Sequence, residues 1–86
     1  MKKIKCDGVN YRKGFIEVSG NIHEGFINLE VWRIHPDTDI SSDMAFDEIP
    51  DEAFTSNAEL ELSLENAEEL LNALKQLVSH AKRGKA

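Results

Sequence analysis

The chain has 86 residues, which is enough for one compact domain and too few for a second domain with its own core. Its 16 acidic and 10 basic residues give a formal net charge of −6, which argues against charge-driven binding to nucleic-acid phosphates or to an anionic membrane. Apolar residues make up 41% of the chain, which is typical of a sequence that folds.

The single cysteine, Cys6, cannot form an internal disulfide and is too few for a zinc site built on thiolates, so we expect a reducing compartment. The first residues include three lysines but no apolar stretch of the length that a secretory signal needs. No apolar run approaches the roughly 18 residues that a membrane-spanning helix requires. We therefore expect a cytoplasmic protein that does not bind membranes.

Two short strands are expected near residues 2–6 and 9–13, on either side of the dipeptide Asp7-Gly8. An Asp-Gly pair suits the two-residue turn of a β-hairpin, so these two strands are predicted to pair with one another. Lysine and arginine would then line one face of this hairpin.

Further strands are expected near residues 15–19, 26–34 and 58–62, because apolar side chains occupy alternate positions there. The face predicted to point inward carries Ile16, Val18, Ile27, Leu29, Val31, Leu60 and Leu62. The opposite, outer face carries Phe15, Glu17, Phe26, Asn28, Glu30, Trp32, Ile34, Glu59 and Glu61.

A helix over residues 64–82 is the clearest element. Its apolar residues recur at three- and four-residue spacing and form one stripe, which contains Ala67, Leu70, Leu71, Leu74, Leu77, Val78 and Ala81. Ser63 suits the N-cap position, and Gly84 suits the left-handed position after the last turn. We expect an α+β fold: a single two-layer domain with an antiparallel sheet of three to five strands and one C-terminal helix packed on one face.

One helix can cover only one face of such a sheet, and the outer face mixes aromatic side chains with carboxylates. This exceeds the scattered apolar residues of a lone monomer, so something is expected to cover it. The candidates are the loop over residues 35–57 folding back, a second copy of the chain, and a foreign partner. A loop of this length usually has packing of its own, and Pro50 could begin a short helical turn within it.

Charge is strongly segregated along the chain. Residues 36–69 contain twelve acidic residues and no lysine or arginine, whereas both ends of the chain are basic. Such a block would speed association with a cationic surface in a salt-dependent way. The alternative is a solvated segment whose charges serve solubility or are neutralised within the molecule.

One segment resembles a calcium-binding loop. Asp37, Asp39 and Ser41 stand at alternate positions and Glu48 at the twelfth, as in an EF-hand. The sixth position is Ser42 where the sharp turn requires glycine, and a predicted strand rather than a helix precedes the loop. Calcium binding is therefore the weakest of the functions considered, and no metal ligand or cofactor site is assigned.

Enzymatic motifs are absent from the sequence. The three histidines lack the spacing of a helical zinc pair, and no nucleophile elbow, phosphate-binding loop or dinucleotide fingerprint occurs. Crowded exposed carboxylates do not indicate the isolated, buried carboxyl that general acid catalysis needs. We expect no catalytic residues.

Two functions remain open. The first is a small acidic binding module, an inhibitor or adaptor that occludes a basic surface of another protein. It would resemble nucleic-acid mimics of the kind that phages use against host defences, or toxin-neutralising immunity proteins, since Glu59 and Glu61 lie about 7 Å apart on a strand, close to the phosphate spacing. The partner-binding residues would be Glu17, Glu30, Trp32, Asp43, Asp47, Glu48, Asp51, Glu52, Glu59 and Glu61.

The second function is a self-associating structural or assembly subunit, a homodimer in the simplest case. Like charges on the outer face oppose its packing against a copy of itself, so such a dimer would use sheet edges or the basic hairpin.

Overall fold

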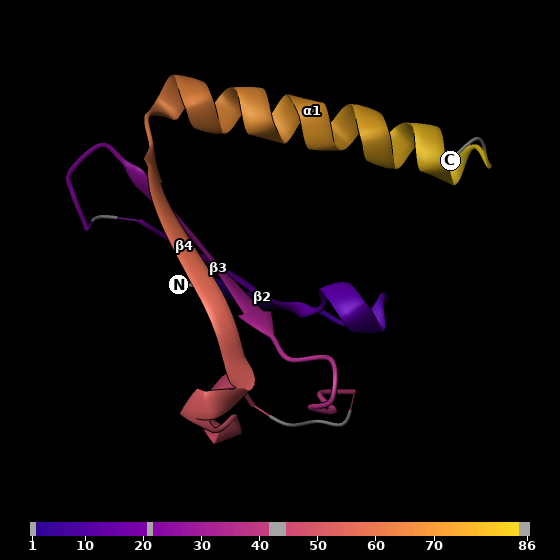
Figure 1. Ribbon diagram of the computed structural model, residues 1–86. Coiled ribbons are helices and arrows are strands. Elements are labelled where there is room, and N and C mark those ends of the chain that lie inside the picture. The colour runs from indigo at the N-terminus through magenta and orange to yellow at the C-terminus, as the bar shows by residue number, and fades with distance from the viewer. Residues whose placement is uncertain (1, 21, 42–44, 85–86) are drawn as a thin grey trace.

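A computed structural model describes residues 2–20, 22–41 and 45–84. Four strands form one antiparallel sheet in the order of the chain: β1 (Lys2–Cys6), β2 (Gly14–Gly20), β3 (Ile27–Ile34) and β4 (Phe54–Leu62). The helix α1 (Leu64–Lys82) follows β4 directly (Figure 1). The predicted α+β architecture of one sheet and one C-terminal helix is confirmed, and the helix has the predicted bounds.

The strand register sorts the side chains into two faces, because residues directly opposite each other in an antiparallel pair point to the same side. We call the first the open face; its middle is apolar, with Ile4, Ile16, Val18, Ile27, Leu29, Val31, Ala58, Leu60 and Leu62, and it also carries Lys2, Cys6, Arg33 and Ser56. We call the second the acidic face; it carries Lys3, Lys5, Phe15, Glu17, Ser19, Asn28, Glu30, Trp32, Asn57, Glu59 and Glu61. The predicted division of residues between two faces therefore holds.

The buried core lies on the acidic face, at the end of the sheet where β3 leaves it. It consists of Phe15, Ile34, Ile40, Ile49 and Ala53, with Trp32, Phe46 and Phe54 packed against it. The segment after β3 returns over this face through two 3-10 turns, Phe46–Glu48 and Asp51–Ala53, and the His35 amide donates to the Ala53 carbonyl across 2.8 Å to close its base. The chain's own loop, which was one of the three coverings considered for this face, therefore covers this end of it.

The assignment of inner and outer faces is thus the reverse of the prediction. Leucine and valine side chains on the open face remain accessible, with Leu60 64% and Val31 42% exposed. The reason is aromatic content: Phe46 packs edge-on against both Phe15 and Trp32 with ring centroids 5.3 and 5.4 Å apart. The open face offers the loop no comparable rings.

The segment predicted as a strand over 9–13 is instead a 3-10 turn over Asn10–Arg12, and β1 pairs with β2 rather than in an Asp7-Gly8 hairpin. The buried Lys13 side chain explains the difference. Its ammonium group donates to Asn10 Oδ1 at 2.7 Å and to the Pro36 carbonyl at 3.0 Å, which ties this turn to the start of the loop. The last strand is also longer than predicted, because β4 begins at Phe54 and takes up the end of the expected loop.

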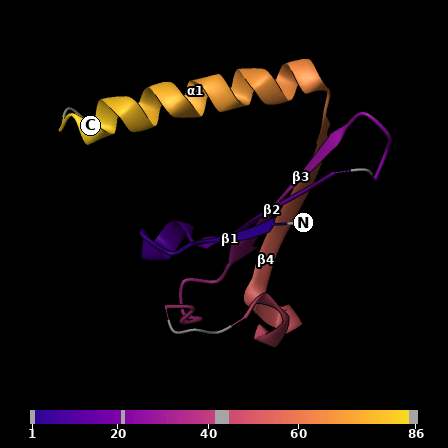
Figure 2. The ribbon, with the colours of Figure 1, turned by 180° about the vertical axis from the view of Figure 1, so that it is seen from behind.

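The helix is placed differently from the expectation that it packs on the sheet. Apart from its junction with β4 it runs away from the strands, so that α1 and the sheet diverge like the arms of a V (Figures 1 and 2). Only Ser63 separates Leu62 of β4 from Leu64 of the helix, and the Ser63 hydroxyl accepts from the Asn66 amide as an N-cap. With a one-residue connection, the backbone at Ser63 sets the angle between the helix and the strands.

Gly14 permits close contact between β2 and β3. A Cβ atom at this position would lie 1.8 Å from the Trp32 carbonyl oxygen, whereas a Cβ at Gly8 would meet nothing within 4 Å. We expect Gly14→Ala to lower the free energy of unfolding by about 2 kcal/mol or more, because β3 must move away. Urea unfolding would measure this, with Gly8→Ala as the control; equal midpoints for the two variants would contradict the described pairing.

Candidate protein-binding surface

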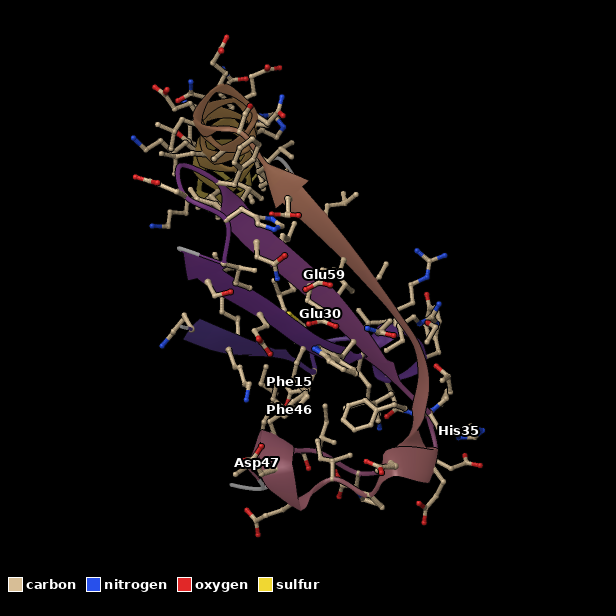
Figure 3. The ribbon with its side chains drawn as sticks, turned by 90° about the vertical axis from the view of Figure 1, so that its left-hand side faces the viewer. Phe15, Glu30, His35, Phe46, Asp47 and Glu59 are labelled. Carbon is tan, nitrogen blue, oxygen red and sulfur yellow. The ribbon has the colours of Figure 1, made fainter. Side chains whose placement is uncertain are left out.

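Three glutamates form a row across the middle of the acidic face. Glu17 of β2 lies directly opposite Glu30 of β3, and Glu30 lies directly opposite Glu59 of β4. Neighbouring strands are about 4.8 Å apart, and like charges directly opposite each other destabilise a sheet. Figure 3 shows Glu30 and Glu59 side by side above the strands. The chain therefore carries a repulsive arrangement at the centre of one face.

Two asparagines orient these carboxylates. Asn57 donates its side-chain amide to Glu30 Oε2 at 2.6 Å, and the buried Asn28 donates to Glu59 Oε2 at 2.8 Å. Two residues after Glu59 on β4, the Glu61 carboxylate pairs with the His23 imidazole. Hydrogen bonds to a carboxylate offset part of the repulsion while they fix its direction. The outcome is a set of negative groups held in place rather than left to move freely.

A lysine lies beside this row at the β1 edge of the sheet. Lys3 lies opposite Glu17, its ammonium group is 4.0 Å from Asp47 Oδ1, and it also stands 4.4 Å from the centre of the Phe46 ring. The Asp47 side chain is 90% exposed, so this ion pair is a weak surface interaction. Glu30 and Glu59, further from β1, have amides rather than cations as their described partners.

The structure brings most of the predicted partner-binding residues to one side of the sheet. Glu17, Glu30, Glu59 and Glu61 lie on the acidic face itself. Acidic residues of the two 3-10 turns that cover the end of this face extend the negative surface: Asp47, Glu48, Asp51 and Glu52. Figure 3 shows Asp47 on its turn, next to Phe46. Asp43 lies outside the described residues.

Trp32 is half-buried at the covered end of this face, where it packs against the core, and its role as a partner-binding side chain stays a prediction. Its ring packs against both Phe46 and Phe54, with centroids 5.4 and 5.3 Å away. Sequence reasoning placed it on the proper face and named the loop as one possible covering of that face, but did not place Trp32 beneath the loop. Conversely, the sequence analysis did not name Asn28, Asn57 or His23 as site residues. Asn28 could have been named, because it lies two residues before Glu30 on the same strand and therefore points to the same face.

The calcium-like segment uses its oxygens within the loop. Asp39 Oδ1 accepts from the Ser41 amide at 2.9 Å and from the Ser41 hydroxyl at 2.6 Å, and these bonds lower the pKa of the Asp39 carboxyl below its ordinary value. Glu48 Oε1 accepts from the Ala45 amide at 2.7 Å. Within residues 2–20, 22–41 and 45–84 no cluster of three or more acidic, histidine or cysteine side chains could hold a metal ion. The Ser42 position of the pattern lies outside those ranges.

Comparisons with known proteins add no relative. No protein-family model matches the chain, and searches of curated proteins and of solved structures find no significant match. In the described part of the chain, no helix combines the length and apolar character needed to cross a membrane.

We expect Trp32→Ala to lower the free energy of unfolding by about 3 kcal/mol, because it leaves a cavity between two phenylalanine rings. Trp32→Phe is the matched variant. The Trp32 indole nitrogen is buried without a hydrogen-bond partner among the described residues, so this variant loses no hydrogen bond and should cost no more than about 1.5 kcal/mol. Chemical denaturation would measure both changes; an alanine variant as stable as wild type would place the indole outside the core.

We expect Glu30→Gln to stabilise the fold by about 0.2–1 kcal/mol, because it removes the central charge of the row while the amide oxygen can still accept from Asn57. The gain should shrink as salt screens the repulsion. Thermal unfolding at low and high ionic strength would measure this, with Glu65→Gln on the helix as a control of equal charge. A loss of stability would show that the row is not repulsive.

Proposed function

We propose that the protein is a small non-catalytic binding module whose acidic face docks on a basic surface of another protein and occludes it. The observation that carries this proposal is the row Glu17, Glu30 and Glu59. Asparagine amides hold Glu30 and Glu59, and the acids of the covering turns continue the row. Repulsive carboxylates placed on a rigid sheet cost stability, and a cationic partner would relieve that cost on binding.

The partner's chemistry follows from the spacing of the carboxylates. A row with strand-to-strand steps of about 4.8 Å suits lysine or arginine side chains that project from one surface, such as a groove that binds nucleic acid. Occlusion of such a groove needs no reaction, which agrees with an inhibitor or adaptor role. A cytoplasmic location and a nucleic-acid-mimicking mode of action belong to the same proposal.

The test is capture of partners from a lysate of the native host on the immobilised protein, with identification by mass spectrometry. We expect proteins with basic surfaces that the wild-type chain retains at low salt and releases at high salt. The double variant Glu30→Gln/Glu59→Gln should lose them. The double variant Glu65→Gln/Glu69→Gln on the helix changes net charge equally and should retain them.

Measured rates make the test sharper. With a captured partner in hand, reversal of Glu59 and Glu61 to lysine should slow association about tenfold or more at low salt and much less at high salt. If the acidic-face variants bind the same proteins at the same rate as wild type, the acidic face is not the binding surface.

A further inference from the structure

The open face and the helix stripe together form an apolar cleft of about 470 Å³ between the arms of the V. From the sheet it is lined by Val18, Ile27, Leu29 and Leu62, and from the helix by Leu64, Ala67, Glu68, Leu70, Leu71 and Leu74. Beyond the cleft the stripe continues with exposed side chains: Leu77 is 67% and Val78 50% exposed. Both arms thus present the kind of surface that globular proteins normally bury.

The chain exposes more surface than a self-contained monomer of its size. Its accessible surface is 6602 Å², whereas a monomer of 9.7 kDa has about 5,100 Å². Its radius of gyration of 14.7 Å compares with about 12 Å for a compact chain of 86 residues. The excess of about 1,500 Å² per chain would give an interface of about 3,000 Å² between two chains, which is the size of an obligate homodimer interface.

Closing the cleft within one chain would require the helix to swing toward the open face. The pivot would be Ser63, where a single residue and an N-cap hydrogen bond connect the helix to β4. The carboxylates that the acidic face offers to a basic partner lie on the reverse side of the sheet. The occupant of the cleft is therefore another apolar surface rather than a charged one.

We propose that the occupant is the helix of a second copy, so that two chains form a symmetric dimer in which each α1 enters the cleft of the other. The dimensions fit: a helix of 19 residues is about 28 Å long, and a strand of nine residues about 30 Å. The arrangement is self-complementary, because each chain supplies one apolar helix and one apolar sheet face, as a two-fold axis requires.

The acidic face stays outside this interface, so the like-charge repulsion that opposes pairing through the acidic face does not arise here. The dimer is held by apolar contacts and should persist in high salt. In this respect it differs from the complex with a basic partner, and the two proposals can fail separately.

The test is the molar mass of the full chain in solution, by sedimentation or by light scattering after size exclusion. We expect wild type to have twice the chain mass of 9.7 kDa at low and at high salt. Leu60→Glu on the sheet and Leu77→Glu on the helix should each raise the dimer dissociation constant by about tenfold or more, because a charge would be buried in the interface. Both side chains are over 60% exposed in one chain, so the variants should keep their secondary structure by circular dichroism.

Val9→Glu is the matched control, since Val9 is an exposed apolar residue that belongs to neither a strand nor the helix and does not line the cleft. It should leave the dimer intact, as should Glu30→Gln/Glu59→Gln. In a mixture of isotope-labelled and unlabelled chains, intermolecular NOEs should connect methyl groups of Leu74 and Leu77 with those of Val18 and Leu29. A monomeric wild type, a dimer that survives both leucine variants, or NOEs within one chain only would overturn the proposal; a monomer would leave the cleft to a foreign helix.

Discussion

The one-residue connection at Ser63 is the constraint on which the rest of the structure depends. It joins the last strand to the helix with no loop, and the N-cap hydrogen bond from the Asn66 amide fixes the direction in which the helix leaves the sheet. The helix consequently leaves most of the strands that precede it uncovered. The buried core instead lies on the opposite face of the sheet, where the loop after β3 packs through Phe46, Ile40 and Ile49.

Two faces of unlike character result from this arrangement. At the covered end of the acidic face, aromatic rings and isoleucines form a small core, while carboxylates occupy the rest of the same face. The cross-strand glutamates cost the fold some stability, and the amides of Asn28 and Asn57 return part of it. A surface that recognises charge needs like charges held at fixed positions. The proposed function therefore rests on the row of glutamates and not on the net charge of −6 alone.

Periodicity in the sequence was sufficient to predict the helix over 64–82, most of the strands and the division of side chains between two faces. The loop over residues 35–57 was one of the coverings expected for the outer face, but periodicity could not decide between them, because alternation says that two residues share a side and nothing about what packs there. That choice depends on contacts such as Phe46 against Phe15, between residues far apart in the chain. The turn at Asn10–Arg12 escaped prediction for the same reason: its tether from Lys13 to the Pro36 carbonyl joins segments on either side of two strands.

The acidic residues of the candidate site could be predicted from the sequence, but their neighbours across the strands could not. Glu30 and Glu59 could be assigned to one face, whereas their register, which makes them direct neighbours, follows from strand pairing alone. Trp32 shows the opposite case, since its face was predicted but its burial depends on the covering loop.

The open face and the acidic face are opposite sides of a single four-stranded sheet, so they are separated by only the thickness of that sheet. Two chains joined through their open faces would therefore direct their acidic faces outward in opposite directions. Such a pair is bivalent: it could bridge two basic surfaces at once, and a partner with two such surfaces would be held by avidity beyond the strength of either contact. The position of the glutamates on the far side of the sheet would then determine the stoichiometry of the complex as well as its charge.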